Sequence, residues 1–368
     1  MGKKIVGVDS EFVDDPNGQV ITSFILQEYP QICDETREST VENIVEEMIG
    51  SRQVRLAGRP TPESEVAMRK VVRSCVENKC PIPVLVVSGP KKTVVGESVD
   101  LAELSALKML ACLDKRVKAF FAPGITVRIR LEDTTGYYLE EGVEGLHETI
   151  ERYVNDFSVL VRVLGYGDFI EPVRERILMT ESQLREAAGE VFPLLLSYLQ
   201  DSEHLEESEW GKLGSWKRLS DTGWQGMIPR EMRQHYHGRY SRLFPGCGEE
   251  DILRLIAKYM AGTLARYQLR ATGAIDSWPG FFQINFAPPV PGIPKSLVST
   301  RLYYRTVPLC HTKRHMPFWR AKGIMKLNGS VRLSLVSWGE KLDINPFVLT
   351  FSDGAESVNV RSDYVLVD

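Results

Sequence analysis

The segment from residue 83 to residue 124 constrains the fold more than any other part of the chain. It begins with an apolar run over 83–87, which is typical of a buried strand, and continues through a polar turn into a helix pattern. A break at Pro123 and Gly124 separates this helix from a second β-like run over 125–130. Strand, helix and strand in this order predict a βαβ unit with two parallel strands.

The spacing of apolar residues shows which face of this helix is buried. They recur every three or four positions, at Leu104, Leu107, Leu110, Leu113 and Val117. In a βαβ unit the ligand usually binds where the first strand ends and the helix begins. That junction holds Ser88, Lys91 and Lys92, followed by Asp100 and Glu103, so we expect a small-molecule site there. Acids in the first turn of a helix are also favoured by the helix dipole, which alone accounts for Asp100.

The composition of the 368-residue chain excludes several classes of protein. Hydrophobic residues make up 43% and charged residues 26%, as in ordinary globular proteins. A net charge of −4 argues against a general nucleic-acid binder, and we find no apolar run typical of a membrane span or a signal peptide. The six cysteines are scattered without CxxC pairs, which favours reduced thiols and a cytoplasmic location. The oligomeric state does not follow from these features.

Further patterns predict helices around the βαβ unit and strands at the end of the chain. Helix patterns cover 38–49, 62–77, 144–164, 181–200 and 249–271. Short strands are predicted over 4–8, 20–26 and 136–139. From Phe281 onward, β-like runs alternate with Pro and Gly turns. We therefore expect an α/β core with helical insertions over 1–275 and a basic, β-rich C-terminal portion over 276–368 that packs on this core.

The C-terminal portion also shows a strong charge asymmetry. Residues 277–339 contain no Asp or Glu. The same segment carries a set of cationic or titratable side chains: Lys295, Arg301, Arg305, His311, Lys313, Arg314, His315, Arg320, Lys322, Lys326 and Arg332. Such a segment indicates either an anion site, since arginine suits phosphate and carboxylate geometry, or a face that docks on acidic partners. Solvated strand edges, which often carry lysine, are the alternative.

Metal chemistry is a second hypothesis. Asp9 and Glu11 follow an apolar run and resemble the first acidic motif of DEDD exonucleases, in which paired carboxylates hold two metal ions. Partner aspartates would have to come from Asp114, Asp133 or Asp156, although acids at a strand end also occur without any such role. His311 and His315 have i, i+4 spacing, but two cations lie between them and the metalloprotease glutamate is absent. The chain has neither a Walker loop nor a GxGxxG motif after a strand, which argues against the usual nucleotide sites.

Five short motifs along 87–136 occur in the order of a known family. They read Val-Ser-Gly-Pro over 87–90, Thr-Val-Val-Gly over 93–96, Val-Asp-Leu-Ala-Glu-Leu-Ser-Ala-Leu over 99–107, Phe-Ala-Pro-Gly-Ile over 121–125 and Glu-Asp-Thr-Thr-Gly over 132–136. In these motifs the chain resembles the isonitrile (isocyanide) synthase family, also called pyoverdine/dityrosine biosynthesis proteins, as a divergent member. Val87, Gln283, Ala287 and Arg320 stand where that family has Lys, Arg, His and His, respectively.

The resemblance implies a Rossmann-like core and an enzyme without a metal or nucleotide cofactor. The implied reaction converts the amine of an amino acid to an isonitrile, with ribulose 5-phosphate as the carbon donor. The residues implied for general acid–base catalysis are Asp100, Glu103, Asp133 and His311, with His315 as the alternative to His311. The phosphate would bind to Ser88, Lys91, Lys92, Arg301, Arg305 and Arg320. A metal-dependent phosphoesterase built on Asp9 and Glu11, or a non-catalytic relative that binds an anion, are the alternatives.

Overall fold

The computed structural model describes a little over half of the chain. The described residues are 40–49, 62–88, 99, 101–131, 133–134, 138, 146–200, 246–271, 282–285, 301–303, 321–327, 330–335, 345–364 and 366–367. The predicted strands over 4–8 and 20–26 lie outside these residues.

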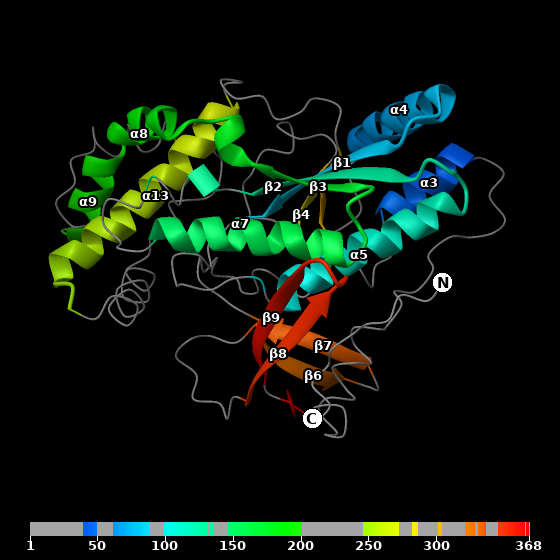
Figure 1. The fold of residues 1–368 in the computed structure, drawn as a ribbon. Coiled ribbons are helices and arrows are strands. Elements are labelled where there is room, and N and C mark those ends of the chain that lie inside the picture. Colours follow the sequence, from blue (N-terminus) through cyan, green and yellow to red (C-terminus); the bar gives the residue numbers. More distant parts are fainter. Residues whose placement is uncertain are drawn as a thin grey trace.

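A parallel five-stranded sheet organises the described part of the molecule (Figure 1). Its strands are β1 (Ile82–Ser88), β2 (Ile125–Leu131), β3 (Ile170–Arg174), β4 (Phe282–Asn285) and β5 (Arg301–Tyr303). The spatial order is β3-β2-β1-β4-β5, and each pair of neighbours is parallel. β1 and β2 pair over their whole length, and helix α5 (Leu101–Lys118) connects them. The predicted βαβ unit is therefore confirmed.

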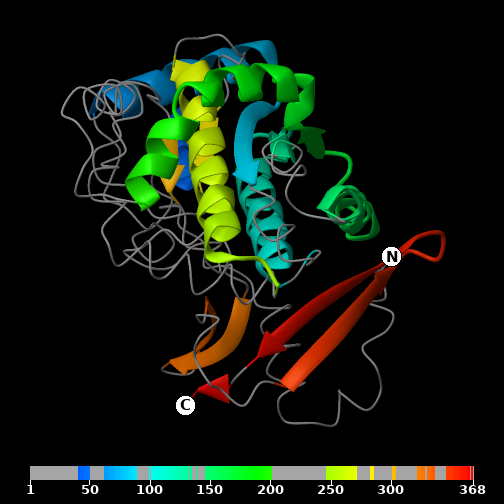
Figure 2. The same cartoon turned by 90° about the vertical axis from the view of Figure 1, so that its left-hand side faces the viewer.

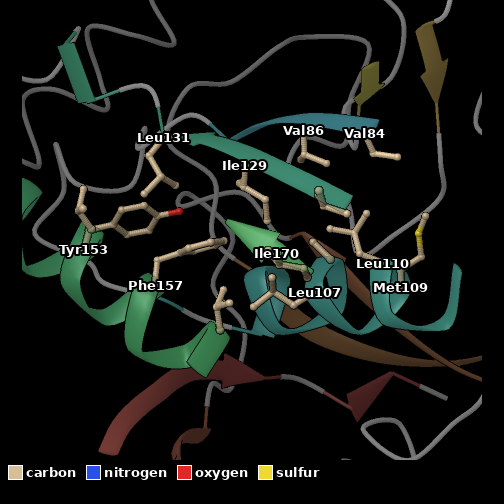
Figure 3. Close-up of a cluster of buried hydrophobic side chains, with 14 of the residues drawn as sticks. Val84, Val86, Leu107, Met109, Leu110, Ile129, Leu131, Tyr153, Phe157 and Ile170 are labelled. Atoms are coloured by element: carbon tan, nitrogen blue, oxygen red, sulfur yellow. The ribbon is translucent and has the colours of Figure 1, made fainter. Parts of the chain in front are cut away.

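Helix α5 buries the face that the sequence pattern predicts. All five residues of its apolar stripe, from Leu104 to Val117, are buried in the core. Figure 3 shows Leu107 and Leu110 of this helix in one cluster with Val84 and Val86 of β1. Three basic residues in the last turn complement the negative end of the helix dipole. Burial of the stripe against the sheet is what holds α5 in place.

The start of β2 is fixed by a contact that requires glycine. The Ile125 N–H donates to Asp114 Oδ1 at 3.0 Å, and Lys118 Nζ lies 2.6 Å from Asp114 Oδ2. Gly124, which directly precedes Ile125, has φ +67°, and a Cβ on it would lie 2.3 Å from Asp114 Oδ1. The glycine after Pro123 is thus required because the backbone passes close to α5 at this position.

The third strand is not where the sequence predicted it. Tyr138, the described residue of the segment 136–139, is helical and buried, so the prediction of a strand there is wrong. The third strand is β3, which follows helix α7 (Leu146–Val163). β3 has a neighbour on one side among the described residues and contains Glu171 and Pro172, which conceal it from a search for apolar runs. The helix predicted over 144–164 is confirmed as α7.

The described residues form five further α-helices around the sheet. They are α3 (Thr40–Ile49), α4 (Pro62–Asn78), α8 (Glu181–Gly189), α9 (Phe192–Gln200) and α13 (Glu249–Ala271), and they confirm the patterns over 38–49, 62–77 and 249–271. The segment 181–200 forms two helices rather than one, because Pro193 cannot donate to the Gly189 carbonyl. α13 packs against α8 and α9 (Figure 2). None of the described helices is long and apolar enough to cross a membrane.

The C-terminal strands divide between the core and separate small sheets. β4 and β5 belong to the parallel sheet, although they follow residue 276. β6 (Ala321–Leu327), β7 (Ser330–Leu335) and β10 (Leu366–Val367) form a second sheet, while β8 (Asn345–Ser352) and β9 (Ser357–Tyr364) form a hairpin. The hairpin lies below α5 and α7 in Figure 1 and contributes Phe351, Val358 and Val360 to the core. The protein is therefore of mixed α/β class.

Candidate functional site

The carboxyl ends of three parallel strands meet at one edge of the sheet. Ser88 of β1 pairs with Leu131 of β2, which in turn pairs with Arg174 of β3. We call this line of residues the carboxyl edge. The residues that follow the strands, Asp133 after β2 and Glu175 after β3, lie next to it. In open parallel sheets, ligands bind outside this end of the strands.

Glu103 lies in the first turn of α5, which follows the β1 end of the carboxyl edge. Its side chain is buried, with 2% of its surface exposed. The Tyr153 hydroxyl of α7, buried as well, donates to Glu103 Oε1 at 3.2 Å. Two helices thus fix this carboxylate, and its place in the first turn is electrostatically favourable. The structure puts the predicted acid–base residue near the predicted ligand end, while its role in catalysis stays a prediction.

Asp133 is fully buried and bound to the end of β3. Arg174 Nε donates to Asp133 Oδ2 at 2.7 Å, and the backbone N–H of Arg176 donates to Oδ1 at 3.2 Å. The same Arg174 guanidinium donates twice to Glu151 of α7, at 2.6 and 3.0 Å. Both oxygens of Asp133 are therefore engaged in linking β2 to β3, and a proton-transfer role would have to operate within this network.

A second buried network lies beside the first. Arg130 of β2 and Glu175 are both fully buried, with 3.5 Å between Nε and Oε1. Arg266 of α13 reaches the same carboxylate, its Nη1 lying 3.9 Å from Oε2. Two guanidinium groups from distant parts of the sequence thus flank one carboxylate. This arrangement holds α13 against the carboxyl edge, because buried charges are costly unless they are paired.

Sequence reasoning missed Arg130, Glu175, Arg266 and Tyr153. One signal was available for Arg130, since a charged residue is unusual in a parallel strand that is covered on both faces. Arg128, two positions earlier, differs from it: Arg128 is partly exposed and pairs with Glu171 across the sheet at 2.9 Å. The pairing of Arg130 with Glu175 could not be identified from spacing, because Glu175 follows β3, the next strand of the sheet, and its second cation, Arg266, comes from α13.

The remaining predicted site residues divide into two groups. Ser88 is the last residue of β1 and Arg301 the first of β5. The others lie outside the described residues: Asp9, Glu11, Lys91, Lys92, Asp100, Arg305, His311, His315 and Arg320.

The described residues add no support to the metal hypothesis. Asp114 caps the amino end of β2, whereas Asp133 follows its carboxyl end, so these two aspartates lie at opposite ends of one strand. Asp156 lies on α7. Within the described part of the chain, no group of three or more His, Cys, Asp or Glu residues is placed to hold a metal ion. The Asp9 and Glu11 pair lies outside it, and a metal site there stays a prediction.

The comparisons with known proteins give a likeness of structure but none of sequence. No model of a known protein family matches the chain, and no curated protein matches its sequence. Among solved structures, the chain is similar to the PvcA protein from Pseudomonas aeruginosa, with 15% identity and a TM-score of 0.49. The alignment covers 89% of this chain and 100% of PvcA.

Proposed function

We propose that the protein is an isonitrile synthase-like enzyme that acts on an amino acid and ribulose 5-phosphate. The observation that carries this proposal is the placement of Glu103. The motif 99–107 carries much of the family resemblance, and from Leu101 onward it forms the start of α5, where it presents a buried carboxylate that Tyr153 holds in position. A buried, oriented carboxylate at the ligand end of a βαβ unit is suited to acid–base catalysis.

The topology of the sheet supports a Rossmann-like core. The order β3-β2-β1-β4-β5, parallel throughout, is that of doubly wound sheets. In such sheets the ligand binds where the strand order reverses, which in this chain is between β1 and β4. Ser88 ends β1 at this point, and β4 contains Gln283, where the family has arginine. If this chain differs from the family in its substrate or carbon donor, we therefore expect the residues responsible to lie at this junction.

The chemical types of the candidate residues suit the first step of the proposed reaction. Condensation of a primary amine with a ketone forms an imine and releases water, and it needs groups that donate and accept protons. Glu103 and Asp133 are the described candidates, and Asp100 and His311 stay predicted ones. The phosphate of the sugar would bind to cationic residues named from the sequence, among them Lys91 and Lys92. Arg301 begins β5 and lies level with Leu85 of β1, three residues before Ser88 at the carboxyl edge.

The test is a direct assay of product formation. Purified protein is incubated with each of the twenty amino acids and uniformly ¹³C-labelled ribulose 5-phosphate, and the products are analysed by mass spectrometry. We expect an isonitrile from one amino acid that contains a single labelled carbon. Glu103→Gln should lower the rate by at least about 100-fold, the range typical for loss of an acid–base group.

Two outcomes would contradict the proposal. One is the absence of any labelled product from protein that circular dichroism shows to be folded. The other is an isonitrile without the label, which would retain the product but exclude the sugar phosphate as donor. Asp114→Asn is a matched carboxylate control, since Asp114 lies at the other end of β2 and should not take part in the chemistry.

A further inference from the structure

The C-terminus of α4 ends in a tight capping turn that brings two cysteines together. Lys79 has φ +53°, the left-handed conformation that terminates many helices. Its N–H donates to the Val76 carbonyl at 3.3 Å, and the Cys80 N–H donates to the Cys75 carbonyl at 3.1 Å. These two bonds define a Schellman motif, in which the side chains at the positions of Cys75 and Cys80 commonly contact each other.

The geometry of this turn is compatible with a disulfide. A backbone hydrogen bond of 3.1 Å between the two residues, together with standard bond lengths, keeps their Cα atoms at most roughly 7 Å apart. Disulfides span Cα separations of up to about 6.8 Å. Both residues are free thiols, Cys75 buried and Cys80 exposed. Burial and the neighbouring Cys80 thiol raise the pKa of Cys75 to about 12.

We propose that Cys75 and Cys80 form a reversible intramolecular disulfide when the protein meets a low-molecular-weight disulfide such as oxidised glutathione. The exposed Cys80 thiolate attacks one sulfur of that disulfide and releases one thiol. Cys75 then loses its proton, and its sulfur attacks the Cys80 sulfur and displaces the second thiol. The two cysteines lose two electrons in total, and the small disulfide is reduced to two thiols, which take up the two protons.

The different environments of the two cysteines assign the order of these steps. Cys80 is accessible, so it meets the oxidant first, while Cys75 is shielded by the core that α4 covers. The high pKa of Cys75 makes the second step the slower one. The product closes a ring across the end of α4, just before β1 begins at Ile82.

The sequence offers a clean way to detect the bond. Trypsin cleaves after Lys79 and separates the peptide 74–79, which contains Cys75, from the peptide 80–91, which begins with Cys80. The full-length reduced protein is incubated with oxidised glutathione under native conditions, and the remaining thiols are alkylated. It is then digested without reduction and analysed by mass spectrometry. We expect the two peptides to be linked, with the loss of two hydrogen atoms, and the link to disappear on reduction.

Two variants and two alternative products test the proposal. Cys80→Ser should abolish the linked species entirely, whereas Cys247→Ser, a substitution at another exposed cysteine, should leave its yield unchanged. The wild-type digest itself tests the proposal, so a loss of folding in a variant does not affect it. Recovery of alkylated Cys75 together with Cys80 bound to glutathione, even after prolonged incubation, would overturn the proposal. A link from Cys80 to a different cysteine would also overturn it.

Discussion

Two ion-paired regions of this molecule differ in geometry and in burial. Their comparison shows that a short distance does not by itself make an ion pair important for the stability of the fold. At the β8–β9 hairpin, Arg162 donates to both oxygens of Glu356 at 2.6 and 2.7 Å, but the side chains are 49% and 40% exposed. At the carboxyl edge, Arg130 and Glu175 are 3.5 Å apart and fully buried. Water and salt screen the first pair, whereas nothing comparable screens the second. Burial therefore decides which pair the fold depends on.

The largest effect is expected from Glu175→Ala. Removal of this carboxylate leaves Arg130 and Arg266 buried beside each other without the charge that they share. Loss of one partner of a buried ion pair costs about 3–5 kcal/mol, so the free energy of unfolding in urea should fall by that amount. Glu356→Ala in the same assay is the matched carboxylate control. An equal loss of unfolding free energy for both variants would contradict the conclusion that burial decides which ion pair the fold depends on.

Gly124→Ala should have the second largest effect. It tests whether a steric penalty at an uncharged residue approaches the loss of stability expected at the buried charged cluster. Its φ of +67° and the 2.3 Å approach of a Cβ to Asp114 combine two penalties. We expect a loss of about 2 kcal/mol in the same unfolding assay. Gly189→Ala is the control, because a Cβ there meets nothing within 4 Å. A neutral result for Gly124→Ala would show that α5 shifts to accommodate the methyl group.

Tyr153→Phe sharpens the comparison within the buried region, since it removes one hydrogen bond and no charge. The expected loss of stability is about 1 kcal/mol, the usual contribution of one hydrogen bond. A double-mutant cycle with Glu103→Gln measures the coupling between the two side chains. If the two losses simply add, the 3.2 Å contact contributes nothing measurable to the folded state.

The smallest effect is expected from Arg162→Ala, and it should depend on pH. The Arg162 guanidinium holds the pKa of Glu356 below its usual value of 4.5, and backbone N–H groups lower the pKa of Asp353 in the same turn. A lowered pKa in the folded state stabilises the protein above pH 4.5 and loses this effect as the pH falls through the lowered value. The small difference in melting temperature between wild type and variant should therefore vanish in acid and in high salt. A difference that persists in acid would contradict this assignment.

The elements that the sequence predicted well share a strong local pattern. Strand β1, helix α5 and strand β2 carry apolar periods that do not depend on distant residues, and α13 was predicted at its observed bounds. β3 was missed because Glu171 and Pro172 interrupt any such period in this strand. The split between α8 and α9 depended on a single proline, which the apolar pattern concealed.

The site could be predicted only in part, and the reason is topological. Glu103 and Asp133 were named from local motifs, and both are buried near the carboxyl edge. Arg130, Glu175 and Arg266 meet there from β2, the end of β3 and α13, which are far apart in sequence. Their meeting depends on the strand order of the sheet, and no local spacing encodes that order.

Among the described residues, β3 lies at the border of the parallel sheet, and this position bears on how the sheet meets other molecules. Strands at the border of a sheet can recruit a strand from another chain, which leads to aggregation. Pro172 removes one backbone donor from this border, and the largely exposed Glu171 places a charge along it. The same residues that conceal β3 from a pattern search should thus keep copies of this protein from joining through that border.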